Sequence, residues 1–79
     1  MRHKHKGNKT LEGRIELIQE ERFRLITKAG RAYLLDLAHD SPTTVDDLQE
    51  WYRSGAIIRV EYEGEPNQES GIAHQARAC

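Results

Sequence analysis

This sequence has little cysteine, no long apolar run and none of the common catalytic motifs. Each of these absences excludes a class of structure or function. The one cysteine, Cys79, cannot form an internal disulfide, so no disulfide framework holds the fold and we expect a free thiol. No apolar run approaches the roughly 20 residues that span a bilayer, so we expect no membrane partner. The GxSxG, HExxH, CxxC and Gly-rich phosphate-binding motifs are absent, which predicts that the chain is not an enzyme.

Charged residues, by contrast, make up 32% of the 79-residue chain, although the formal net charge is only -1. Residues 1–14 hold five Lys or Arg and one Glu, and the remaining 65 hold seven Lys or Arg and twelve Asp or Glu. The basic start has no apolar segment behind it, unlike a signal peptide, so we expect a cytoplasmic protein. The acidic body would repel a nucleic-acid backbone at long range, whereas the basic start would attract one.

The length predicts a single domain over residues 10–77, between a flexible basic arm at 1–9 and a short tail at 78–79. The arm has one apolar side chain and no periodicity, so it cannot bury enough surface to become ordered. His3 and His5 alternate with lysines there, and two imidazoles beside repelling ammonium groups are too few ligands for a metal ion. We therefore expect neither a metal nor another cofactor.

The stretch 13–37 organises the domain, because its apolar and charged residues alternate. A period of two predicts strands with one buried face. The residues expected to point inward are Ile15, Leu17, Phe23, Leu25, Tyr33, Leu35 and Leu37. Breaks at 19–21 and 28–30 are short enough to allow only antiparallel neighbours. The expected strands of this meander cover about 10–18, 22–27 and 31–38.

Three residues refine the meander. Gly13 falls on the inward parity, where a glycine marks a bulge or a bend of a sheet into a barrel. Ile18 breaks the alternation, which is consistent with a bulge or a buried strand end. Gly30 supplies the positive φ that a tight hairpin usually requires.

In the second half of the domain, the sequence pattern predicts a helix and two more strands. After Pro42 ends the sheet, a threonine caps a helix of about three turns that stops at Gly55. Its apolar face carries Val45, Leu48, Trp51 and Tyr52, and we expect Trp51 to be a core plug together with Leu48. Alternation then predicts a fourth strand at about 56–63 and a short fifth strand at about 72–76. A polar loop at 64–71 connects them, and 77–79 form a tail.

A meander with a curling first strand, followed by a helix and a hairpin, resembles the OB-fold, a small barrel. Three runs of the chain also resemble short bacterial proteins without an assigned function: GRIELIQEERFRLIT, YLLDLAHDSP and VEYEGEPNQESGIAH. The resemblance implies a mainly β, five-stranded OB-like barrel (β-β-β-α-β-β) whose helix lies between strands three and four. The alternative is an SH3-like roll, which does not usually place three helical turns at that point.

Two kinds of binding function fit this fold, and the first is an interaction with another protein or a peptide. Ile26 and Leu34 lie on the outward parity of adjacent strands and predict an apolar patch. The loop 64–71 lies where OB-folds often carry recognition residues. The candidate residues of this loop are Glu65, Asn67 and Gln68. The leading prediction is therefore a non-enzymatic interaction module.

The alternative is weak binding of single-stranded nucleic acid through the basic arm and three arginines, Arg22, Arg24 and Arg31. Such sites need exposed rings for base stacking, whereas Phe23 and Tyr33 fall on the inward parity. Glu12 and Glu16 are also expected to pair with the strand arginines.

Acid–base chemistry is limited to His39 beside Asp40, and to His74. His39 could move protons at the mouth of the barrel, but no nucleophile or metal accompanies it. His74 is expected to be packed and hydrogen-bonded on a strand. These residues do not predict an active site.

Overall fold

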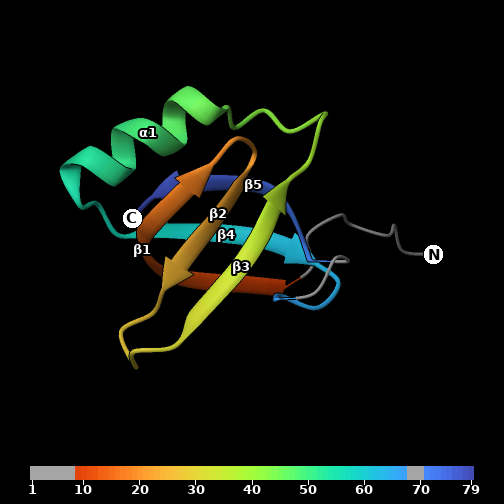
Figure 1. Cartoon of the computed structure of the whole chain (residues 1–79). Helices are drawn as coiled ribbons and strands as arrows, with labels where there is room; N and C mark the ends of the chain where they lie inside the picture. Colours follow the sequence, from red (N-terminus) through yellow and green to blue (C-terminus); the bar gives the residue numbers. More distant parts are fainter. Residues whose placement is uncertain (1–8, 68–70) are drawn as a thin grey trace.

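The computed structural model describes residues 9–67 and 71–79, which form a mainly β domain with one helix (Figure 1). Five strands close into a barrel in the order β1-β2-β3-β5-β4, and β4 returns to pair with β1. The elements are β1 (Lys9–Gln19), β2 (Arg22–Ile26), β3 (Ala32–Leu37), α1 (Val45–Ser54), β4 (Ile58–Glu63) and β5 (Ile72–Ala78). The OB-like fold class predicted from the sequence is confirmed, with the helix between β3 and β4.

The ends of the domain differ slightly from the prediction. Lys9 already pairs with Tyr62 and so belongs to β1 rather than to the arm. At the other end, β5 continues through residues 77 and 78, which the sequence had assigned to the tail, because β4 supplies their partners. The Cys79 amide then donates to the Ile57 carbonyl at 2.9 Å. Within the described part of the chain, no helix has the length and apolar character needed to cross a membrane.

Gly13 is the point at which β1 changes partners. Before it, β1 pairs with β4, and from Arg14 onwards it pairs with β2. A Cβ at Gly13 would stand 2.2 Å from the carbonyl oxygen of Ile26, a distance no side chain tolerates. Glycine is therefore the residue that lets the β1 backbone pass the end of β2, at the point where the sheet closes into a barrel.

A bulge in β1 decides which side chains face outward. The register with β2 shifts between Ile15 and Leu17, which leaves Glu16 as the extra residue. Ile18 beyond it lies opposite Phe23 and packs against the core, whereas Leu17 is 40% exposed. The prediction that Leu17 points inward is therefore wrong, and the break in alternation at Ile18 marks the bulge.

The core fills the barrel and is completed by the helix. It consists of Ile15, Phe23, Leu25, Leu35, Leu37, Leu48, Ile58, Val60 and Ala73. Thr44 caps α1 in a reciprocal pair with Asp47, and Gly55 ends the helix with a φ of 70°. Leu48 is the residue of α1 that is fully buried, while Trp51 is half-buried at the edge of the core. Leu48, rather than the expected Trp51, is therefore the main plug, and Trp51 assists it from the edge of the core.

Replacing Gly13 with Ala tests the passage of β1 past β2. The new Cβ would collide with the Ile26 carbonyl, so we expect the free energy of unfolding to fall by about 3 kcal/mol or more. Gly30→Ala is the control, because nothing lies within 4 Å of its Cβ and only its left-handed φ of 86° opposes the change. That control should cost about 1 kcal/mol. Urea denaturation monitored by Trp51 fluorescence measures both, and equal losses would contradict the steric argument.

A second prediction ranks the two helix residues. Leu48→Ala leaves a cavity in the core and should cost about 3 kcal/mol of unfolding free energy. Trp51→Ala should cost less, about 1–3 kcal/mol, because part of the indole is already in water. Circular dichroism in urea compares the variants without relying on the tryptophan signal. The reverse ranking would restore Trp51 as the main plug.

Candidate functional site

The outer surface of β1, β2 and β3 forms one continuous face, because the register places their outward side chains in rows. We call it the meander face. Its rows, starting next to the β1–β2 turn, are Gln19, Arg22 and Asp36; Leu17, Arg24 and Leu34; and Arg14, Ile26 and Ala32. Four of the predicted surface residues therefore share one face, namely Arg22, Arg24, Ile26 and Leu34. Arg31 lies beside it in the β2–β3 turn, where its carbonyl accepts from the Thr27 amide.

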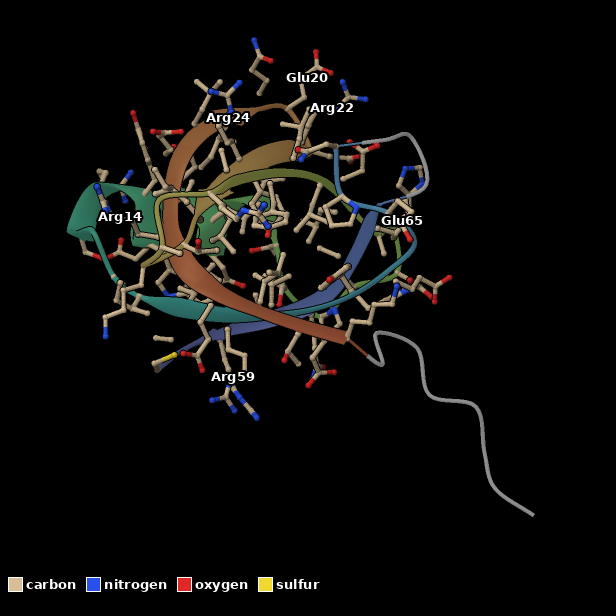
Figure 2. All side chains as sticks on the ribbon, turned by 90° about the horizontal axis from the view of Figure 1, so that it is seen from below. Arg14, Glu20, Arg22, Arg24, Arg59 and Glu65 are labelled. Atoms are coloured by element: carbon tan, nitrogen blue, oxygen red, sulfur yellow. The ribbon has the colours of Figure 1, made fainter. Side chains whose placement is uncertain are left out.

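The arginines of the first two rows are paired with carboxylates. Arg22 Nε lies 2.8 Å from Asp36 Oδ1, and Arg24 Nη1 lies 3.8 Å from Glu16 Oε1. The expected partner of Arg24 is confirmed, whereas Arg22 pairs with an aspartate of β3. Figure 2 shows Arg22 and Arg24 pointing away from the barrel on one side, with Arg59 on the opposite side. Both pairs are half-exposed, so they contribute little stability but balance the local charge.

The apolar part of the meander face is centred on the middle row. Leu17 and Leu34 flank Arg24 from the two neighbouring strands. Leu34 and Ile26 are only half-buried, and Leu17 is the most exposed large aliphatic side chain of the face. Reasoning from alternation missed Leu17, and the signal that could have revealed it is the irregularity at Ile18.

Aromatic rings are absent from the nine residues of the meander face. Phe23 is 1% exposed, and Tyr33 lies half-buried opposite Leu25 on the inner side of the sheet. Tyr52, 45% exposed, belongs to α1 and not to this face. The face therefore lacks the rings on which single-stranded nucleic acids stack.

A hollow of about 400 Å³ adjoins the last row of the face. We call it the lower hollow. It is lined by Glu12, Gly13, Arg14, Ile26, Thr27, Lys28 and Ile57. Ile57 is 49% exposed, which makes it the most exposed large apolar side chain among the described residues. The carboxylate of Glu12 is bound by Arg59, and this hydrogen bond and charge raise the pKa of the Arg59 guanidinium.

Three cations near the β2–β3 turn, of which Arg14 and Lys28 line the lower hollow, differ from the arginines described above. Among residues 9–67 and 71–79, Arg14, Lys28 and Arg31 form no ion pair. Arg14 stands apart from Arg22 and Arg24 in Figure 2, towards the edge of the barrel. The meander face is thus charge-balanced near the β1–β2 turn and positive near the β2–β3 turn.

A wider and more polar hollow, of about 990 Å³, lies at the β1–β2 turn. It is lined by Gln19, Glu20, Glu21, Arg22, Asp36, Leu37, Ala38, His39 and Ile72. His39 Nε2 lies 3.4 Å from Glu21 Oε1, but the imidazole is 89% exposed. Asp40 is not part of this lining. A histidine this exposed to water lacks the enclosure that general acid–base catalysis needs.

His74 gives no better support for catalysis. Its Nε2 atom is enclosed, and Glu63 Oε1 lies 3.0 Å away without the geometry of a hydrogen bond. The expectation of a packed side chain agrees with its 16% exposure, but its Nε2 atom makes no hydrogen bond with the described residues, although hydrogen bonding of this histidine was expected. In the described part of the chain, no group of three or more His, Cys, Asp or Glu is arranged to hold a metal ion.

The loop between β4 and β5 is tied to the sheet through Asn67. The side-chain Oδ1 accepts a hydrogen bond from the backbone amide of Leu34 at 2.6 Å. The backbone amide of Asn67 donates to the Leu34 carbonyl at 2.9 Å. Its Nδ2 donates to the Ala32 carbonyl at 3.4 Å. Of the other candidates, Glu65 lies 4.0 Å from Lys9, and Gln68 is outside the described residues. The Asn67 side chain is therefore engaged by β3.

The anchoring role of Asn67 predicts a graded loss of stability. Asn67→Ala removes the side-chain amide and leaves a residue with a left-handed φ of 72°, so it should cost about 1–2 kcal/mol. Asn67→Gly removes only the amide, because glycine adopts this φ freely, and should cost less. Urea denaturation measures both. Parent-like stability of both variants would show that the contacts with β3 are dispensable.

The fold by itself does not identify a ligand, because OB-like barrels carry many unrelated functions. The ligand of this chain therefore depends on its own surface, in particular on the meander face and the lower hollow. Comparison with models of known families, with characterised proteins and with solved structures gives no match.

Proposed function

We propose that the chain is a small cytoplasmic, non-enzymatic module that binds another protein or a peptide through the meander face. The observation that carries this proposal is the middle row, in which Leu17 and Leu34 flank the outward guanidinium of Arg24. Protein interfaces are enriched in arginine, whose aliphatic stem packs on apolar groups while its charged head stays in water or beside a carboxylate, as the head of Arg24 does beside Glu16. A row of this kind offers a partner an apolar contact surface without requiring it to displace Glu16.

The alternative proposal is weak binding of single-stranded nucleic acid through Arg22, Arg24, Arg31 and the basic arm. The lack of an ion pair at Arg31 favours it within the described residues. The carboxylate partners of Arg22 and Arg24 and the lack of rings weigh against it, because phosphates would have to displace Asp36 and Glu16. The meander face therefore suits a protein partner better.

Selection of peptides from a displayed library of random dodecamers tests the proposal. We expect enrichment of specific peptides on the full chain, and at least a tenfold loss of their affinity in the variant Leu17→Ala/Arg24→Ala. The matched control, Tyr52→Ala/Arg53→Ala, also removes one exposed apolar side chain and one exposed arginine, but from α1. It should bind like the parent. Failure to enrich any peptide, or equal losses in both variants, would overturn the proposal.

Titration with labelled single-stranded DNA and RNA, at low and moderate salt, tests the alternative. We expect no saturable change in fluorescence anisotropy, because the face offers no stacking platform. Binding that weakens steeply with salt and disappears in Arg22→Ala/Arg24→Ala would establish the alternative instead.

A further inference from the structure

The two ends of the meander face present different chemistry to a partner. At the β1–β2 turn, Arg22 is paired with Asp36, and the carboxylates of Glu20 and Glu21 line the same hollow, so this end carries more acidic than basic groups. Around the β2–β3 turn, the described residues offer no ion partner to Arg14, Lys28 or Arg31. A ligand with negative charge is therefore attracted to this second end, and it displaces no internal carboxylate when it binds there.

The lower hollow at this end has room for a side chain as well as a charge. Its volume of about 400 Å³ is comparable with that of small ligand sites, which span about 300–1,000 Å³. Ile26 and Ile57 give it an apolar lining, and the bare backbone of Gly13 forms part of its wall. Arg14 and Lys28 line the same hollow. The carboxylate of Glu12 in the same lining is held by Arg59, and the described residues give Arg14 and Lys28 no ion pair. Such a lining fits an aliphatic group that is accompanied by carboxylates.

We propose that the lower hollow is the anchor site for an acidic segment of the partner protein. In this proposal, which rests on the function proposed above, an aliphatic side chain of the segment packs against Ile26 and Ile57. Adjacent Asp or Glu side chains of the segment bind Arg14 and Lys28. Among the described residues that line the hollow there is no aromatic side chain, so they do not favour a nucleic-acid base over this peptide.

Recognition is made by side chains, because the neighbouring strands offer little free edge for an added strand. β1 pairs with β4 along its first half and with β2 along its second half. The edge of β3 near the turn is occupied by Asn67, which bonds the backbone of Ala32 and Leu34. Strand addition needs unpaired backbone groups, so it does not supply the affinity here.

The composition and charge dependence of the selected peptides test this inference. We expect the enriched dodecamers to carry Asp or Glu next to Leu, Ile or Val. The affinity of one such labelled peptide should fall at least tenfold in Arg14→Gln/Lys28→Gln and in Ile57→Ser. The control Arg53→Gln/Arg77→Gln removes two positive charges outside the hollow and should change the affinity less than threefold. Thermal unfolding of each variant confirms that the barrel is intact, and amide chemical shifts should move most at Gly13 and Lys28.

The outcomes separate the anchor site from the proposed function. Enriched peptides without acidic residues, or equal affinities for the two charge variants, would overturn the anchor site while leaving the interaction module standing. A complete lack of enriched peptides would instead overturn the module itself. Displacement of the bound peptide by oligothymidylate, together with loss of oligonucleotide binding in Arg14→Gln/Lys28→Gln, would assign the hollow to nucleic acid and overturn the acidic segment.

Discussion

The close approach of Gly13 to the carbonyl of Ile26 is the contact on which the rest of the barrel depends. One strand, β1, must serve two partners: it pairs with β4 up to Gly13, passes the end of β2 there, and pairs with β2 from Arg14 onwards. If this passage were blocked, the inward side chains of the meander would lack the facing strands that bury them. The same passage leaves an apolar lining beside Arg14, so closure of the sheet and the shape of the lower hollow have a common cause.

The bulge at Glu16 links the fold to the candidate interface. An extra residue in β1 reverses the parity beyond it, which sends Ile18 into the core and Leu17 to the surface. Glu16 itself lies near Arg24 and balances its charge. One local irregularity therefore supplies both the exposed leucine and the acidic partner of the arginine in the middle row. Bulges frequently re-aim side chains at functional surfaces in this way.

Most of the fold could be predicted from the sequence, because it follows from local rules. Alternation, the turn at Gly30 and the helix caps at Thr44 and Gly55 each depend on a few neighbouring residues. Parity also placed four residues of the candidate site on one face. The remaining features depend on contacts distant in the chain. Asn67 bonds a strand 33 positions away, and the last residues of β5 are held by β4. No local sequence pattern indicates such pairings. Alternation also assigns side chains to the wrong face of a strand beyond a bulge.

The attachment of Asn67 also determines how much of the β3 edge is open to another strand. β3 pairs in parallel with β5 only at Asp36 and Leu37, so its earlier residues would present bare backbone groups. Bare edges recruit strands from other molecules and lead to aggregation. Asn67 occupies this edge with its side chain and its backbone amide, and no further strand is needed. The loop between β4 and β5 therefore covers part of the β3 edge with which another strand could otherwise pair.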